Sequence, residues 1–178
     1  MHKAAFIDRD GVINEDREYI YRAADFHLIP GAAAALAALR AAGYLLVVVT
    51  NQSGIARGLY SVDDYRELET HMCLVLSQAG VLLDSIQHCP HGPDSSCECR
   101  KPRPGMILAA CAELDIDPAR SILIGDRRAD IEAGRAAGVG RCFLVESGKP
   151  LSAADRTHAD GTYADLARCV AELLRSGG

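Results

Sequence analysis

Three short apolar segments, each followed at once by a polar turn, constrain the fold of this chain more than any other feature. The segments and their turns are 3–7 with Asp8, 45–49 with Thr50 and Asn51, and 121–124 with Gly125 and Asp126. Short apolar runs of this kind are typical of strands that are buried on both faces of a parallel sheet. Helical patterns lie between them, and this alternation predicts an α/β fold with a central parallel sheet and helices on both faces.

The helical segments are bounded by residues that favour helix ends. Ser61 begins a capping-box pattern, and Gly43, Gly80 and Gly138 follow the last residues of three helical segments. The expected helices are 32–42, 62–79, 105–114, 129–137 and 163–174, with a further strand at 141–145 and a loop over 146–161. The polar segment 14–25 is expected to form a hairpin-like flap beside the end of the first strand.

Length, charge and cysteine content narrow the class of protein. A chain of 178 residues is predicted to form a single domain. Its 24 acidic and 19 basic residues give a net charge of −5, which disfavours nucleic acid as a partner. No apolar run reaches the roughly 18 residues that a membrane span requires, and the charges at 8–10 argue against a signal peptide. We expect a cytoplasmic monomer without disulfides, because the seven cysteines form no framework of pairs.

Polar side chains at the three strand ends are expected to meet at one edge of the sheet. They are Asp8, Asp10, Thr50, Asn51 and Asp126. Aspartates beside a glycine are also common in ordinary turns, but independent turns give no reason for all of them to coincide. Carboxylates gathered at one place need a cation, and Asp8 and Asp126 are the best side-chain ligands for Mg²⁺. A phosphate bridging to that ion needs a positive partner, and Lys101 beside Arg100 is the candidate, although alone both are typical surface charges.

Four ordered motifs carry a resemblance to a known family. They are Asp8-Arg9-Asp10-Gly11-Val12-Ile13-Asn14, Thr50-Asn51-Gln52-Ser53-Gly54, Arg100-Lys101-Pro102 and Gly125-Asp126-Arg127 with Asp130. Together they resemble the motifs of the haloacid dehalogenase (HAD) superfamily of phosphatases, whose fold is Rossmann-like. The first motif and the Cys/His loop before Arg100 resemble the subgroup that contains heptose bisphosphate and histidinol phosphate phosphatases. The short spacing between the first two motifs leaves no room for an inserted cap domain.

The resemblance implies a role for each matched residue. Asp8 would form an aspartyl phosphate, and Asp10 would act first as general acid and then as general base. Thr50 and Lys101 would hold the phosphoryl oxygens, and Asp130 would orient its neighbours rather than bind metal. The implied Mg²⁺ ligands are the side chains of Asp8 and Asp126 and the backbone oxygens of Asp10 and Arg127, where the family often has Lys. The implied substrate-binding residues are Asp16, Arg17, Glu18, Tyr19, Asn51, Gln52, Ser53 and Arg100.

The stretch 88–104 has no apolar periodicity and concentrates metal-ligating side chains. These side chains are Cys89, His91, Cys97 and Cys99. A Cys₃His set suits tetrahedral Zn²⁺ and leaves no position for water, whereas thiols without metal are the alternative. The resemblance assigns His91 rather than the adjacent His88 as the fourth ligand. We expect a structural zinc that holds Arg100 and Lys101 at the mouth of the site.

The functional hypothesis that the resemblance implies is a Mg²⁺-dependent phosphatase. It would release the C7 phosphate of D-glycero-D-manno-heptose 1,7-bisphosphate in the ADP- or GDP-heptose pathway of lipopolysaccharide or surface polysaccharide biosynthesis. Hydrolysis of histidinol phosphate, in histidine biosynthesis, is the alternative within the same chemistry. A phosphoaspartate signalling receiver is the alternative from another class, but a receiver needs neither an acid at Asp10 nor a zinc loop.

Overall fold

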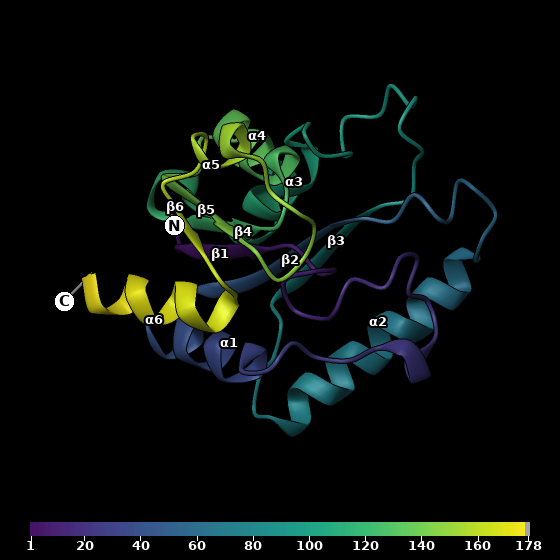
Figure 1. Ribbon diagram of the computed structural model, residues 1–178, viewed down its shortest axis with the longest axis horizontal. Coiled ribbons are helices and arrows are strands. Elements are labelled where there is room, and N and C mark those ends of the chain that lie inside the picture. Colours follow the sequence, from purple (N-terminus) through teal and green to yellow (C-terminus); the bar gives the residue numbers. More distant parts are fainter. Residues whose placement is uncertain (177–178) are drawn as a thin grey trace.

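The computed structural model describes residues 1–176 and confirms the α/β expectation (Figure 1). Its strands form one six-stranded parallel sheet in the order β3-β2-β1-β4-β5-β6. The strands are β1 (Ala4–Ile7), β2 (Leu45–Asn51), β3 (Ser85–Cys89), β4 (Ile122–Gly125), β5 (Arg141–Val145) and β6 (Gly161–Tyr163).

Helices cover both faces of the sheet. They are α1 (Ala32–Ala41), α2 (Val62–Gln78), α3 (Gly105–Leu114), α4 (Arg128–Ala136), α5 (Ala153–Arg156) and α6 (Leu166–Ser176), with 3₁₀ turns η1 (Ala23–Asp25) and η2 (Pro118–Arg120). Figure 1 shows α1, α2 and α6 on one side of the sheet, and α3 and α4 on the other. The short helix α5 lies near α4 in this view.

The apolar strands have no polar face because each residue packs against one of two helical layers. In β1, Ala5 and Ile7 join the core formed with α1, α2 and α6, whereas Ala4 and Phe6 join the core formed with α3 and α4. All four side chains are fully buried. Burial on both faces explains why the strands appear in the sequence as continuous apolar runs rather than as alternating patterns.

The strand order creates a crevice at the end of β1. Ile7 pairs with Val48 of β2 on one side and with Ile124 of β4 on the other. The chain passes from β1 to β2 on one side, and β4 is added later on the opposite side. Ligands of open α/β sheets bind beyond the carboxyl ends of the strands at such a switch point. The predicted catalytic and Mg²⁺-binding residues lie at or after these strand ends, except Lys101, which comes from the segment between β3 and α3.

The carboxyl-terminal part of the chain differs from the sequence-based expectation. The expected helix 163–174 was wrong at its start, since Tyr163 pairs with Val145 as the last residue of β6. The helix begins only at Leu166, after Asp165, whose side chain accepts a hydrogen bond from the Arg168 backbone at 2.8 Å. The expected loop 146–161 likewise contains the helix α5, which is capped by a hydrogen bond to its preceding serine side chain.

The prediction of a hairpin-like flap over 14–25 was also wrong. Segment 14–25 makes only isolated bridges, from Asn14 to Asp10 and to Leu28, and then forms the turn η1. Glu18 and Tyr19 have φ values of 58° and 49°, in the left-handed region that side chains other than glycine seldom occupy. The flap is therefore an irregular loop rather than a pair of strands.

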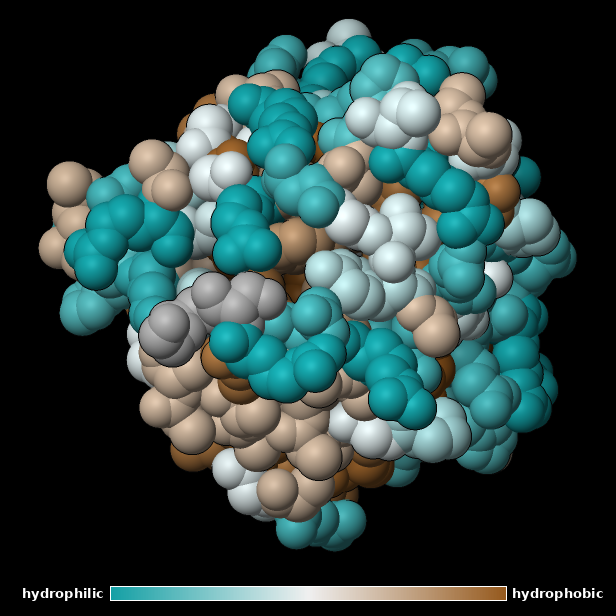
Figure 2. Space-filling model, turned by 60° about the vertical axis from the view of Figure 1, so that its left-hand side comes forward, coloured by the Kyte–Doolittle hydropathy of each residue, from teal (hydrophilic) through white to brown (hydrophobic). Residues whose placement is uncertain are grey.

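The surface is mostly hydrophilic on the face that Figure 2 presents, with apolar side chains gathered in its lower part. Within residues 1–176, every helix falls short of the length and apolar character that crossing a bilayer demands.

Candidate active site

The strand ends bring two of the predicted acids together. Asp8 follows β1, and its N–H donates to the Ile124 carbonyl of β4 at 3.0 Å. Asp126 follows β4 and is fully buried. Gly11 turns the chain past this carboxylate with φ +82°, and a Cβ at Gly11 would lie 2.7 Å from Asp126 Oδ2. Only glycine satisfies both conditions, so the turn after Asp10 is shaped to pass directly over Asp126.

Lys101 joins the site from the loop between β3 and α3. Its Nζ donates to Asp8 Oδ1 at 2.9 Å and to the Val49 carbonyl at 2.8 Å, and it lies 2.5 Å from Asp130 Oδ1. Burial disfavours the charged ammonium, but the carboxylates of Asp130 and Asp8 outweigh burial and raise the pKa of Lys101. The buried lysine is therefore a fixed positive charge beside Asp8.

Asn51 connects the end of β2 to this lysine. Its Nδ2 donates to the Lys101 carbonyl and its Oδ1 accepts from the Lys101 backbone N–H, both at 3.1 Å. The side chain of Asn51 is thus occupied in holding the backbone of Lys101. Its backbone N–H remains the group through which the family pattern implies a substrate contact.

The acids also form a set that could hold a metal ion. Asp8, Asp126 and Asp130 each offer a carboxylate oxygen, and the three oxygens lie within 4.8 Å of one another. Asp126 Oδ1 is buried and accepts no hydrogen bond, although Arg127 Nε lies 3.6 Å from it, whereas Oδ2 accepts from the Lys149 backbone at 2.9 Å. Burial, together with the Asp130 charge, raises the pKa of Asp126 to about 6, and burial raises the pKa of Asp8 well above its ordinary value. A buried carboxylate oxygen that accepts no hydrogen bond, beside carboxylates whose ionised form is disfavoured by burial, fits a hard divalent cation such as Mg²⁺.

Asp130 is committed to its neighbours, as expected from its place in the first turn of α4. Its Oδ2 accepts from the Arg127 backbone N–H at 3.0 Å and its Oδ1 pairs with Lys101. A Cβ on Gly125 would lie 2.3 Å from the Asp130 side chain, so glycine at this position admits the carboxylate. Asp130 therefore both caps α4 and orients the lysine.

Asp10 is held by nitrogen donors from two segments. Arg9 approaches both of its oxygens, with Nη2 at 2.9 and 2.8 Å, and Asn14 Nδ2 donates to Oδ1 at 3.0 Å. Gln52 Nε2, from the end of β2, donates to Oδ2 at 3.1 Å. Arg9 is 1% exposed, so its guanidinium is a buried structural support for Asp10 rather than a group offered to a ligand.

A cleft of about 240 Å³ opens beside these groups and collects nearly all of the predicted residues. The predicted residues that line it are Asp8, Asp10, Asp16, Glu18, Tyr19, Thr50, Asn51, Gln52, Ser53, Arg100, Lys101 and Arg127. Two residues predicted for this site do not line it: Asp126 is fully buried behind the cleft surface, and the guanidinium of Arg17 pairs with Glu15 at 2.6 Å. A substrate contact by Arg17 stays a prediction from the sequence.

Two polar residues that line the cleft were not predicted from the sequence. Lys149 comes from the loop after β5, and its Nζ lies 3.0 Å from Asp16 Oδ2, which Arg127 also approaches at 3.4 Å. The strand-end rule that identified Asp126 could have found Lys149, since it follows another parallel strand at the same edge. Tyr60 also lines the cleft, but an aromatic residue just before a helix cap gives no sign of it.

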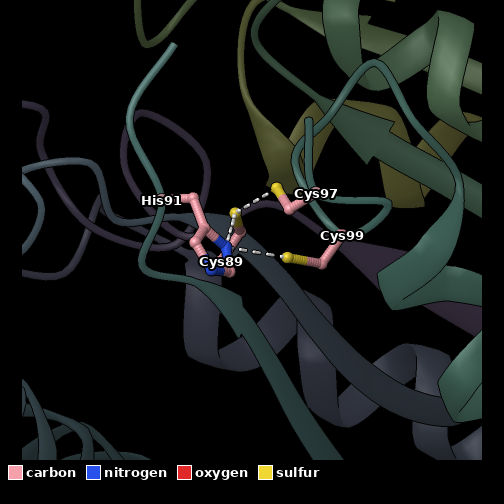
Figure 3. Close-up of side chains that lie close together, drawn as sticks. All are labelled: Cys89, His91, Cys97 and Cys99. Carbon is pink, nitrogen blue, oxygen red and sulfur yellow. Dashed lines mark hydrogen bonds between the residues drawn. The ribbon is translucent and has the colours of Figure 1, made fainter. Parts of the chain in front are cut away.

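The four predicted zinc ligands converge at the end of β3 and in the loop that follows it (Figure 3). Cys89 Sγ lies 3.8 Å from Cys97 Sγ and 3.5 Å from His91 Nδ1, and Cys99 Sγ lies 3.3 Å from the same nitrogen. The edges of a tetrahedral zinc site are about 3.8 Å between sulfurs and about 3.6 Å between sulfur and nitrogen. His88 is not part of this cluster, because its ring packs against Tyr65 at 4.4 Å. The spacing of the ligand atoms therefore fits a tetrahedral metal ion.

The Cys/His loop also connects to the cleft. Arg100 Nη1 donates to the His91 carbonyl at 3.2 Å, so the arginine beside Lys101 is braced by a cluster residue. Arg103 Nη1 donates to the Ser95 carbonyl at 2.8 Å and also to the Cys97 carbonyl. These contacts make one continuous unit of the cluster and the Arg100-Lys101 segment.

Known proteins with similar sequences and structures support this description of the fold and site. A family model described as HAD-hydrolase-like matches residues 98–173. The D-glycero-beta-D-manno-heptose-1,7-bisphosphate 7-phosphatase of Pasteurella multocida is 43% identical, covering 97% of this chain and 99% of its own. The D-glycero-alpha-D-manno-heptose-1,7-bisphosphate 7-phosphatase of Photorhabdus laumondii is 45% identical, covering 84% and 86%. The crystal structure of D,D-heptose 1,7-bisphosphate phosphatase from B. bronchiseptica, complexed with magnesium and phosphate, matches with a TM-score of 0.87 at 34% identity, covering 98% and 99%.

The parallel sheet, the strand-end acids and the buried lysine are those of a HAD-like hydrolase. Within that class, the chain belongs to the family of D-glycero-D-manno-heptose-1,7-bisphosphate 7-phosphatases, because relatives at this identity extend over nearly its whole length.

Proposed function

We propose that this protein is a Mg²⁺-dependent phosphatase that removes the C7 phosphate of D-glycero-D-manno-heptose 1,7-bisphosphate, in the biosynthesis of lipopolysaccharide or surface polysaccharide. The observation that carries the proposal is the meeting of Asp8, Lys101 and Asp126, from three remote segments, beside a polar cleft that Asp8 and Lys101 line. The printed names of the family relatives support the choice of substrate.

In the first step, a carboxylate oxygen of Asp8 attacks phosphorus and the bond between phosphorus and the sugar oxygen breaks. Asp10 gives its proton to the departing sugar oxygen. Thr50 holds a phosphoryl oxygen and the positive charge of Lys101 attracts the phosphoryl group, whose charge changes little in a loose transition state, so their contribution is chiefly positioning. When bound, Mg²⁺ would be held by Asp8 and Asp126, with backbone oxygens of Asp10 and Arg127, and would neutralise charge on the phosphoryl group.

In the second step, water attacks the aspartyl phosphate and transfers a proton to Asp10. The bond between phosphorus and the Asp8 oxygen breaks, which releases phosphate and restores the carboxylate. One residue serves as acid and base in turn because each step leaves it in the form that the next step needs.

Selectivity is proposed to come from the rim of the open cleft. The guanidinium of Arg100 suits a second acidic group of the substrate. Asp16, Glu18 and Tyr19, from the irregular loop after β1, line the same cleft. We further infer that Cys89, His91, Cys97 and Cys99 bind a structural Zn²⁺ that fixes this rim. The cytoplasmic location and the monomeric state stay predictions from the sequence.

The deciding experiment compares phosphate release from the α- and β-anomers of heptose bisphosphate with release from histidinol phosphate, each with Mg²⁺. We expect kcat/KM for one heptose anomer to exceed that for histidinol phosphate by at least about 100-fold, because a site built for two phosphates rejects a substrate that lacks one. Faster hydrolysis of histidinol phosphate would assign the chain to histidine biosynthesis. Failure to turn over even p-nitrophenyl phosphate would favour the receiver.

Asp8→Asn supplies the mechanistic control. We expect no measurable turnover, because an amide is neither a competent nucleophile nor a good ligand for a hard cation. The comparison variant is Asp155→Asn, at a helix-capping residue of α5 that does not line the cleft, and it should turn over at the normal rate. A near-normal rate for Asp8→Asn would exclude the covalent route.

A further inference from the structure

The hydroxyl of Tyr60 ends a chain of hydrogen bonds that reaches the reacting groups. Tyr60 is 6% exposed, and its hydroxyl donates to Gln52 Oε1 at 2.6 Å. Gln52 is 3% exposed and has no role in the sequence-based scheme except as a predicted substrate contact. Its carbonyl oxygen is already occupied by the tyrosine.

The amide nitrogen of the same glutamine donates to two residues of the proposed mechanism. Nε2 lies 3.1 Å from Asp10 Oδ2 and 2.8 Å from Thr50 Oγ1. Both hydrogens of the amide are thus directed at acceptors, and its oxygen at the Tyr60 hydroxyl. The side chain of Gln52 is fully used within the protein, so it positions Asp10 and Thr50 instead of binding substrate.

The ring of Tyr60 is itself fixed. It stacks on the ring of Tyr21, with centroids 5.3 Å apart and planes inclined by 13°. It also packs against Gly54 so closely that a Cβ there would lie 2.2 Å from the ring. Burial raises the pKa of Tyr60 to about 12, so the hydroxyl keeps the proton that it donates. The tyrosine is a rigid support for the glutamine.

We propose that Tyr60 is a positioning residue for catalysis, which acts through Gln52 to hold the carboxylate of Asp10 and the hydroxyl of Thr50 in place. Without the tyrosine hydroxyl, the Gln52 carbonyl would be left buried and unpaired, and the amide would be free to rotate away from Asp10. The consequence falls on the chemical step, because neither Tyr60 nor Gln52 needs to touch the sugar. This inference rests on the phosphatase function proposed above.

The test is Tyr60→Phe, which keeps the stacked ring and removes only the hydroxyl. We expect kcat with heptose bisphosphate to fall by about tenfold, the effect of one lost hydrogen bond with its partner left unpaired, while KM stays within about twofold. Tyr21→Phe is the matched control, because it removes a hydroxyl from the other ring of the same stack and should leave both constants unchanged.

A double substitution shows whether the effect passes through the glutamine. Gln52→Ala alone should lower kcat, and adding Tyr60→Phe to it should lower kcat no further. Additive losses, an unchanged kcat in Tyr60→Phe, or a rise confined to KM would each overturn the proposal.

The outcome is separable from that of the proposed function. Hydrolysis of p-nitrophenyl phosphate by the same variants reports the positioning of Asp10 and Thr50 whatever the natural sugar is. If heptose bisphosphate is not turned over but the aryl ester is, the comparison of kcat values between variants still decides the role of Tyr60.

Discussion

The buried ammonium of Lys101 must satisfy three oxygen acceptors at once. A flexible ammonium can direct its three hydrogens at Asp8, Asp130 and the Val49 carbonyl, whereas a planar guanidinium cannot match these directions. The charge is also the neutralising partner of two buried carboxylates. This explains why a lysine that reads as a surface residue in the sequence is 5% exposed in the structure.

Replacing Lys101 by Met should therefore damage both activity and stability. We expect kcat to fall by at least about 100-fold, because a preorganised charge at the phosphoryl group is lost. The free energy of unfolding should fall by about 3 to 5 kcal/mol, because Asp8 and Asp130 lose their counter-charge. Steady-state kinetics and urea denaturation measure the two effects.

The control for this charge is Lys3→Met. Lys3 lies over the Tyr44 ring at 4.1 Å, away from the cleft, and should contribute less than about 1 kcal/mol. Equal losses in the two variants would contradict a special role for Lys101.

The position of Gly148 has no room for a side chain, because the carboxylate of Asp126 lies directly beside it. A Cβ at this position would lie 2.0 Å from Asp126 Oδ2, so Gly148→Ala must displace the carboxylate. We expect weaker Mg²⁺ binding, seen as a rise of several-fold in the Mg²⁺ concentration for half-maximal activity. Gly92→Ala is the control, since its nearest atom would be 3.8 Å away. If both variants need the same Mg²⁺ concentration as the parent, Gly148 has no part in placing the ligand.

Single residues differ in how far the sequence could predict them. Asp8 and Asp126 follow apolar strands, and the ends of parallel strands must meet, so their proximity could be derived before the structure was known. Tyr60 has no such pattern, because its hydroxyl reaches Gln52 only after the loop beyond β2 has folded back. A hydrogen bond between side chains depends on coordinates that periodicity does not contain.

At the scale of elements, the loop between β3 and α3 joins the Cys/His cluster to the cleft. Cys99→Ala should reduce bound zinc, which we expect in near-equal ratio to protein in the parent, and should raise KM because Arg100 loses its support from His91. Metal analysis and steady-state kinetics measure the two effects.

Cys73→Ala on α2 is the matched control for the loop, because this cysteine lies outside the cluster. It should keep both the zinc and the KM of the parent. Loss of zinc from Cys99→Ala with no change in KM would separate the metal from the substrate rim.

Tertiary packing, rather than the local sequence pattern, can decide where a helix or strand begins and ends. Tyr163 is predicted from the sequence to begin the last helix, yet it pairs with Val145 as the last residue of β6. β-Branched and aromatic side chains favour strands, but three residues are too few for a periodic signal. Pairing with the neighbouring strand β5 decided the outcome, and β6 became the edge strand of the sheet.

At the scale of the whole molecule, negative charge is concentrated where a metal ion can offset it. The chain carries a net charge of −5, and three of its carboxylates share one buried site with a single lysine. Without a divalent cation, this site disfavours the ionised form of Asp126, whose pKa lies at about 6 instead of 3.8. The stability of the folded protein should therefore depend both on pH and on the binding of Mg²⁺.

The sign of this linkage gives a prediction for the stability of the whole domain. Because Asp126 binds its proton more tightly when folded than when unfolded, the proton stabilises the metal-free protein at low pH, and this contribution is lost as pH rises from about 4 to about 6. Mg²⁺ requires the ionised carboxylate, so its stabilising effect should grow through the same range. We expect saturating Mg²⁺ to raise Tm clearly at about pH 7.5 and much less at about pH 5. In Asp126→Asn, which has no carboxylate to titrate, the Mg²⁺ shift should be small at both pH values. An equal Mg²⁺ shift at both pH values in the parent protein would mean that Asp126 does not ligate the ion, since a ligand that must lose its proton makes metal binding depend on pH.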